Sequence, residues 1–206
     1  MIHNRIQLKR KKIFILQFFK CQLSDVPRTA AFYDDVLKWL VEHINYPRWI
    51  PGVYPSEDSV RAMTQSGSQY ICFLDHSQED RVTALHYGPD NITDLIGKIA
   101  AAFALSDDVQ GAFWKGNWSR DLENGQFAVI HALAIDPALQ RMGLGSQIVR
   151  FCVEEAKAQG YQAMRVDIVP GNLPARSLFE KKGFAGSATW TWRWASKGSR
   201  CSVCTN

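Results

Sequence analysis

A short apolar run in the middle of the chain, from Phe127 to Ile135, places the strongest constraint on the fold. It is too short to span a membrane and is typical of a strand that is buried on both faces of a sheet. Asp136-Pro137 ends the run, and an amphipathic helix follows that closes at Gly160. The apolar stripe of that helix consists of Ile148, Val149, Cys152, Val153 and Ala156. A second strand at 163–169 completes a strand–helix–strand unit, which predicts a mixed α/β sheet.

Apolar periodicity and turn residues divide the rest of the chain into further elements. The expected helices are 26–44, a segment capped by Ser56 and running to 65, 92–105 and 172–182. The expected strands are 13–20, 69–74, 81–87 and 189–194, with 69–74 and 81–87 paired as an antiparallel hairpin. The first helix should bury a stripe made of Phe32, Val36, Leu37, Leu40 and Val41.

The length and composition of the chain fit one domain. It has 206 residues, of which 46% are hydrophobic, so a full core can be buried. We expect the domain at 13–194, a basic N-terminal extension at 1–12 and a C-terminal tail at 195–206. The basic residues 9–12 and the apolar residues after them imitate a signal peptide. The apolar run is short and no cleavage site follows, so we predict a first strand there.

Charge and cysteine usage narrow the class of function. The formal net charge of +4 suits an anionic ligand and does not by itself indicate nucleic acid. The five cysteines are scattered and odd in number, which predicts a reducing compartment, the cytoplasm, and no disulfide framework. Cys201 and Cys204 form a single CxxC without a second pair, so we expect no metal site.

The loop between the apolar strand and its helix reads Gln140-Arg141-Met142-Gly143-Leu144-Gly145, followed by Ser146. The first turn of a helix has unpaired N–H groups and partial positive charge, and glycines let the backbone approach a ligand, so the loop suits an anion. A P-loop is excluded because Ser146 stands where its lysine belongs. A dinucleotide fingerprint fails because Ile148 replaces its third glycine. A tight turn without a ligand remains the alternative.

Two landmarks together resemble one family. Ile135-Asp136-Pro137 with the loop 140–145 resembles the Q/R-x-x-G-x-G/A motif of the GNAT superfamily of N-acetyltransferases. The segment Asn172-Leu-Pro-Ala-Arg-Ser-Leu-Phe-Glu-Lys-Lys-Gly-Phe184 resembles the N-x-x-A-x-x-L-Y-x-x-x-G-F signature of that family. The resemblance is sharp over 127–184. It implies a mostly antiparallel central sheet with a splayed parallel strand pair, flanked by helices.

The resemblance also implies a site for acetyl-CoA as acyl donor. Its pyrophosphate would contact the backbone amides of Gln140, Arg141, Met142, Gly143, Leu144, Gly145 and Ser146. Its pantetheine arm would pair with the main chain at Leu133, Ala134 and Ile135, as an added strand does. Asn172 would lie beside the cofactor and also cap its own helix. Phe179 stands where the family usually has a tyrosine that protonates the leaving thiolate, so that role is unfilled here.

Acyl transfer to an amine needs a group that accepts a proton. His131 lies two residues before Leu133 and, in a regular strand, on the same face, so it is a candidate base; a packed sheet histidine is the alternative. Glu123, Asp121 and His86 are further candidates, and each of them is more typical of a solvated surface group. Asp167 should be buried in its strand, with Arg165 or Arg176 as its partner. Aromatic residues that suit a cationic amine occur at Trp49, Tyr54, Trp114 and Trp118.

These observations predict direct transfer of an acetyl group from acetyl-CoA to a primary amine, of a small molecule or a protein, in a ternary complex. The alternative is a catalytically silent acyl-CoA-binding sensor or assembly module, which Phe179 and the lack of a glutamate at Val129 favour. We expect an amine acceptor as partner, no nucleic acid and no membrane. The sequence leaves room for a homodimer.

Overall fold

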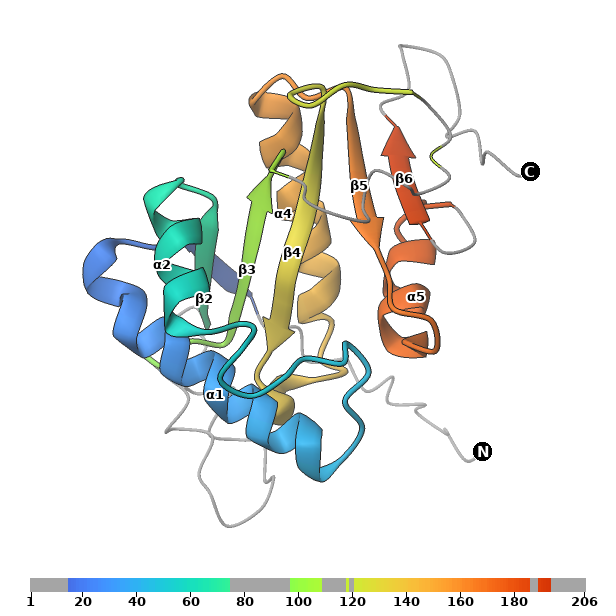
Figure 1. The fold of residues 1–206 in the computed structure, drawn as a ribbon. Helices are drawn as coiled ribbons and strands as arrows, with labels where there is room; N and C mark the ends of the chain where they lie inside the picture. Colours follow the sequence, from blue (N-terminus) through green and yellow to red (C-terminus); the bar gives the residue numbers. More distant parts are fainter. Residues whose placement is uncertain (1–14, 75–96, 109–117, 119–120, 186–188, 194–206) are drawn as a thin grey trace, which may run out of the picture.

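The computed structural model describes residues 15–74, 97–108, 118, 121–185 and 189–193 (Figure 1). They form one six-stranded sheet in which the strands follow their order in the chain. The strands are β1 (Leu16–Lys20), β2 (Gln69–Leu74), β3 (Ala101–Ser106), β4 (Phe127–Ile135), β5 (Ala163–Asp167) and β6 (Thr189–Arg193). Only β4 and β5 run parallel, and all other neighbours are antiparallel. The expected mixed sheet with one parallel pair is therefore confirmed.

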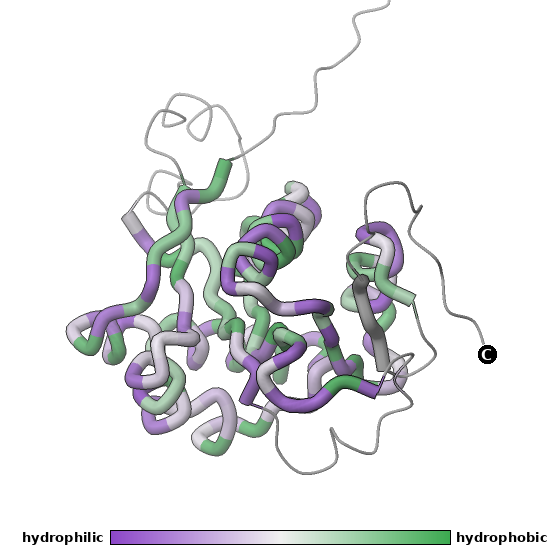
Figure 2. Tube along the Cα trace, turned by 90° about the horizontal axis from the view of Figure 1, so that it is seen from above, coloured by the Kyte–Doolittle hydropathy of each residue, from purple (hydrophilic) through white to green (hydrophobic). Residues whose placement is uncertain are grey.

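Helices cover both faces of this sheet. On one face, α1 (Val26–Glu42) and α2 (Glu57–Gln65) pack over β2, β3 and the end of β4. On the other face, α4 (Leu144–Ala158) packs across the middle of the sheet, and α5 (Leu173–Glu180) lies beside it. We call these the α1 face and the α4 face. Seen from above, hydrophobic positions lie mostly between the layers and hydrophilic positions mostly on the outer turns (Figure 2).

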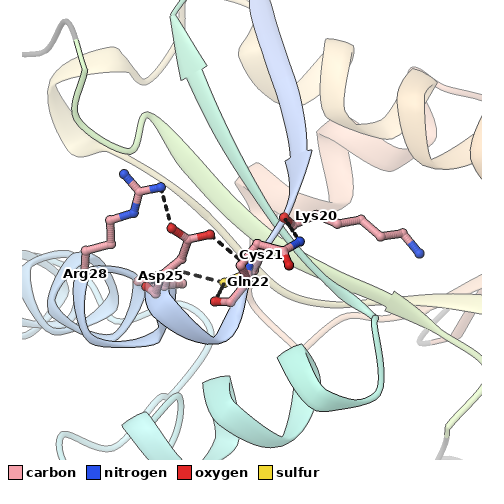
Figure 3. A network of polar contacts seen from close by, with 6 residues as sticks. Lys20, Cys21, Gln22, Asp25 and Arg28 are labelled. Carbon is pink, nitrogen blue, oxygen red and sulfur yellow. Dashed lines mark hydrogen bonds and ion pairs between the residues drawn. The ribbon is translucent and has the colours of Figure 1, made fainter.

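The start of α1 is fixed by polar contacts at its junction with β1 (Figure 3). The Asp25 carboxylate accepts a hydrogen bond from the Gln22 backbone N–H at 2.8 Å. It also forms an ion pair with Arg28, with a nitrogen–oxygen distance of 2.6 Å. Gln22 Nε2 donates to the Lys20 carbonyl at 3.3 Å. The Gln22–Asp25 contact caps the short 3-10 turn Leu23–Asp25, which leads directly into α1.

The sequence predicted several element bounds correctly. Strands 69–74 and 127–135 are observed with the predicted ends, and Ser56 caps α2 by accepting from the Ser59 N–H. In α1 the stripe differs from the prediction, because Val41 is exposed whereas Tyr33 is fully buried. The ends of the predicted first strand and final strand, 13–14 and 194, lie outside the described residues.

The predicted helix at 92–105 is wrong where the structure describes it, because Ala101–Ser106 is the central strand β3. The alanine-rich sequence favours a helix locally, but these small side chains are buried on both faces between β2 and β4. The predicted strand 81–87 lies outside the described residues. Both edges of β2, its predicted partner, are occupied by β1 and β3.

No helix among the described residues has both the length and the apolar character needed to cross a bilayer.

Candidate functional site

The parallel strands β4 and β5 separate toward their carboxyl ends (Figure 1). They pair only from Phe127 and Ala163 to Val129 and Arg165, although β4 continues to Ile135. The Asp136 N–H donates to the Ala100 carbonyl on the β3 side. Successive N–H groups of a strand alternate between its edges, so those of Leu133 and Ile135 point into the gap, which we call the splay. The splay therefore offers a main-chain edge to which an extended ligand can bind.

A β-bulge interrupts β4 just before this edge. Ala102 pairs with Ala134 and Ala104 pairs with His131, so Ala132 and Leu133 stand opposite the single residue Phe103. Ala132 has φ +48°, a left-handed conformation that is uncommon for alanine. The bulge reverses the alternation of side chains, because Ile130 and then Leu133 both contact the α4-face core.

The prediction that His131 and Leu133 share a face is therefore wrong. His131 pairs with Ala104 and lies on the α1 face, whereas Leu133 packs on the α4 face. Had β4 been regular, residues two apart would have pointed the same way; the bulged residue removes that relation.

His131 lies at the α1-face mouth of the splay. Its ring is half-buried, its Nε2 atom is enclosed, and none of the described residues hydrogen-bonds to Nε2. Burial lowers the pKa of His131. The charges of Asp167 and Asp108 and a hydrogen bond to the Asp108 backbone raise it, but they offset only part of the effect of burial. The imidazole is therefore neutral at pH 7, the form in which it accepts a proton.

The other acid and base candidates are dispersed. Glu123 and Asp121 are exposed in the turn before β4, at the end of the strand away from the splay. Asp167 was predicted to be buried, but it is exposed at the last position of β5, beyond the residues that pair with β4. Continuing the register beyond Val129 and Arg165 places Asp167 across the mouth of the splay from His131. His86 lies outside the described residues.

Arg165 is the buried charge in β5, and it is not the predicted partner of Asp167. Its guanidinium lies over the Phe127 ring at 3.8 Å and over the Trp118 ring at 4.7 Å. Burial lowers the pKa of Arg165 to about 10, against the charge of Asp121, so it stays charged at pH 7. Arg176 pairs instead with Glu180 one turn along α5.

The loop 140–146 brings its predicted residues to the amino end of α4. Gly143 is the N-cap with φ +86°, and no described side chain caps the helix, so its first N–H groups face outward. Gln140 and Arg141 are exposed, Met142, Gly145 and Ser146 are half-buried, and Leu144 packs in the core. The geometry fits an anion bound by backbone amides.

The two loop glycines are needed for different reasons. A Cβ on Gly143 would meet nothing within 4 Å, so only its positive φ favours glycine there. A Cβ on Gly145 would lie 3.0 Å from Leu178 and 3.4 Å from Ile135. Gly145 therefore lets α4 approach α5 and β4 closely, a packing role that the sequence did not predict.

Two predicted residues of the cofactor site lie on α5. Asn172 is its N-cap, and its Oδ1 accepts from the Ala175 N–H at 3.1 Å. Phe179 is 3% exposed and packs edge to face against Phe184, with ring centroids 5.1 Å apart. Position 179 is thus part of the α4-face core, and whether it also contacts a cofactor stays a prediction.

Aromatic residues gather over the α1 side of the bulge. The Trp49 ring lies edge to face with Tyr33, at 6.1 Å between centroids, and with Tyr54, at 6.3 Å. Burial and the charge of Asp167 raise the pKa of Tyr54, so its phenol keeps its proton. Tyr54 and His131 thus both feel the charge of Asp167, and Trp49 connects Tyr54 to Tyr33 at the bulge. Trp114 lies outside the described residues.

The sequence did not single out two buried residues at the bulge, Tyr33 and Gln69. The Tyr33 hydroxyl donates to the Ala132 carbonyl at 2.9 Å, and Gln69 Nε2 donates to that hydroxyl at 3.3 Å. Tyr33 lies one helical turn before Val36, so its position on the apolar stripe was the available signal. For Gln69 the neighbouring sequence gives no signal of a role at the bulge; it shows only a polar residue at the start of a strand.

A groove of about 730 Å³ lies on the β3 side of β4, across that strand from the splay. It is lined by α1 residues, by 97–99 and by 136–138, and it contains none of the predicted catalytic residues. Among the described residues no group of three or more histidine, cysteine or acidic side chains is arranged to hold a metal ion.

Comparisons with known proteins agree with this geometry. Residues 53–184 match the model of the acetyltransferase (GNAT) family. No curated protein sequence matched the chain.

Solved structures of low sequence identity share the fold. A GNAT-family acetyltransferase from Streptococcus agalactiae is 12% identical, with a TM-score of 0.66 over 88% of this chain and 96% of that one. One from Listeria monocytogenes is 13% identical, with a TM-score of 0.63 over 88% and 95%. A Salmonella typhimurium acetyltransferase, solved with its cofactor acetyl-CoA, is 13% identical, with a TM-score of 0.55 over 92% and 99%.

Proposed function

This chain belongs to the acetyltransferase (GNAT) family, and from that premise we propose that it transfers an acetyl group from acetyl-CoA directly to a primary amine. The observation that carries the proposal is the splay of β4 and β5 beside the uncapped amino end of α4. An anion-binding helix terminus and an open strand edge suit the two ends of a CoA molecule.

The donor would enter from the α4 side. Backbone amides of 140–146 would hold its pyrophosphate, with the exposed Arg141 adding charge. The main chain of Leu133 and Ile135 would pair with the pantetheine arm, because their N–H groups point into the splay. Asn172 would lie beside the donor while its Oδ1 continues to cap α5. The thioester would then reach the bulge, next to His131.

The acceptor would approach from the α1 face. Trp49 and Tyr54 present aromatic rings there, and Asp167 supplies a carboxylate across the splay from His131. A carboxylate and aromatic faces both favour a cationic amine over a neutral one. His131 is the group we place as base, because it is neutral at pH 7 and its enclosed Nε2 has no hydrogen-bond partner among the described residues.

Before the transfer step the bound ammonium gives one proton to water, and the nitrogen lone pair of the resulting neutral amine attacks the thioester carbonyl carbon. The new C–N bond forms, the C–S bond breaks, and CoA leaves as a thiolate. The second proton lost by the nitrogen passes to His131, and the thiolate takes its proton from water, since Phe179 has no hydroxyl. The imidazolium then gives its proton to the hydroxide that remains, which restores water and neutral His131. A thiol has a reference pKa of about 8.5, so the thiolate leaves without an acid.

Direct transfer is also supported by the described cysteines. Cys21, Cys72 and Cys152 are buried, and burial raises the pKa values of Cys72 and Cys152. A covalent acyl-enzyme needs an accessible thiolate; none of these three thiols is accessible, and those of Cys72 and Cys152 stay protonated.

A panel of amines tests the proposal. Purified protein is mixed with acetyl-CoA and, in turn, with polyamines, amino acids, aminoglycosides and peptides, while released CoA thiol is measured. We expect amine-dependent release, fastest with cationic amines. Binding of acetyl-CoA by calorimetry without release for any amine would favour the alternative, a silent acyl-CoA-binding module, to which the absence of the family tyrosine at Phe179 also points.

A further inference from the structure

The bulge in β4 is contacted by buried side chains that lie far from it in the sequence. Ala132 adopts φ +48° without a glycine, and the register shift leaves two residues of β4 facing one of β3. Such a conformation persists only where the surroundings hold it. A slip of one residue would turn Leu133 and Ile135 away from the α4 face and change which N–H groups point into the splay.

Tyr33 and Gln69 tie the two strands together at this point. The Tyr33 hydroxyl, fully buried in α1, donates to the carbonyl of Ala132 on β4 at 2.9 Å. Gln69 Nε2 donates to the same hydroxyl at 3.3 Å and to the carbonyl of Phe103 on β3 at 3.1 Å. The carbonyls on both sides of the bulge are therefore joined through one phenol and one amide.

The orientation of the Gln69 amide follows from its neighbours. Its Nε2 also lies 3.1 Å from the Tyr70 carbonyl, so reversing the amide would set its oxygen against two carbonyl oxygens. Its Oε1 is buried without a hydrogen-bond partner among the described residues, so the amide gives up one acceptor contact to keep this arrangement. The orientation of the Gln69 amide is thus fixed, with Nε2 directed toward the bulge.

We propose that Tyr33 and Gln69 are positioning residues for acetyl transfer, which hold the β4 bulge so that its main chain presents the thioester to the acceptor. The proposal rests on the proposed function. The loop 140–146, which would hold the pyrophosphate, lies beyond the end of β4, so loosening the bulge should misplace the reacting carbonyl while leaving most CoA contacts intact. The rate of transfer should therefore suffer more than the affinity for CoA.

The test compares Tyr33→Phe with Tyr70→Phe. Tyr70 is equally a buried tyrosine, but its hydroxyl contacts Glu155 of α4 at 3.1 Å, on the opposite face from the bulge. We expect Tyr33→Phe to lower kcat about tenfold or more with the KM for acetyl-CoA nearly unchanged, because small misplacements of reacting groups are costly. Tyr70→Phe should leave both constants near those of the wild type.

A binding measurement separates this inference from the proposed function. Calorimetry gives the affinities of each variant for acetyl-CoA and for CoA, without turnover. Tyr33→Phe should lose part of the preference for acetyl-CoA over CoA, with affinity for CoA itself retained. If wild-type protein acetylates no amine, the proposed function fails, and this ratio still decides whether the bulge network positions the acyl group.

Equal kinetics and equal affinity ratios in Tyr33→Phe and Tyr70→Phe would overturn the inference and leave the network a purely structural one. If Tyr33→Phe does not fold, Gln69→Leu provides the second variant, since it removes the link to Phe103 and keeps the bond from Tyr33 to Ala132. Gln69→Leu should lower kcat and the preference for acetyl-CoA over CoA, each by a smaller factor than expected for Tyr33→Phe. Unchanged values in a folded Gln69→Leu protein would likewise contradict the proposal.

Discussion

At the scale of single residues, water exclusion determines what His131 does. Removing water penalises the charged imidazolium, and the partial compensation from Asp167 and Asp108 leaves the pKa of His131 below its ordinary value. A base is useful only in its unprotonated form, so a lowered pKa keeps this imidazole available over the neutral range.

This argument predicts a pH dependence. The neutral form of His131 prevails above its folded-state pKa, so kcat/KM should be level at pH 7 and fall as the pH drops through a value below about 6.5. His131→Gln should lower kcat by about 10²–10⁴-fold and abolish that acidic limb. Glu123→Gln, which changes the other predicted base, should alter neither, because Glu123 lies at the far end of β4. The reverse pattern in initial-rate profiles would move the base to Glu123.

The two loop glycines give a second prediction at this scale. Gly145→Ala should reduce stability by about 1–3 kcal/mol, since the new methyl group meets Leu178. A second change, Leu178→Val, should recover part of that loss. Gly143→Val should instead weaken acetyl-CoA binding, because a β-branched residue does not adopt the positive φ of this position, although its Cβ would meet no neighbour within 4 Å. Gly143→Asn should retain most of the affinity, because asparagine tolerates a positive φ.

Thermal unfolding and calorimetry on these variants distinguish the two roles. If Gly145→Ala folds as stably as the wild type, or Gly143→Val binds acetyl-CoA as well as Gly143→Asn does, the assigned roles are incorrect.

At the scale of elements, the sequence predicted the strand–loop–helix unit because each of its signals is local. Neighbouring residues alone are enough to identify the apolar run of β4, the turn at Gly143 and the apolar stripe of α4. β3 was missed because its alanines signal a helix until β2 and β4 enclose them. The bulge was missed because the side chains that contact it, Tyr33 and Gln69, are remote from β4 in the sequence. No signal for it is therefore present within the strand itself.

The α5 helix carries a prediction about Phe179. Its ring packs against Phe184 in the core, so the hydroxyl introduced by Phe179→Tyr needs a buried partner and should cost about 1–3 kcal/mol without one. We expect a lower unfolding temperature and an unchanged turnover, because the thiolate already leaves without an acid. A stable variant with raised turnover would instead place position 179 beside the thioester sulfur and restore the family's acid.

At the scale of the whole molecule, all residues of the three described core clusters lie between Leu16 and Phe184. The basic extension at 1–12 and the tail at 195–206 remain predictions. A protein beginning at Lys12 should therefore keep the unfolding midpoint and the acetyl-CoA affinity of the full chain. A loss of either on truncation would show that the extension belongs to the domain.

The central claim is that acetyl-CoA bound in the splay gives its acetyl group straight to an amine. Mass spectrometry after incubation with isotopically labelled acetyl-CoA tests it most directly, on the protein alone and with the best amine of the panel. The account predicts an unmodified protein without amine and, with amine, one labelled acetyl amide for each CoA released. A labelled acyl group on the protein that the amine then removes would contradict direct transfer.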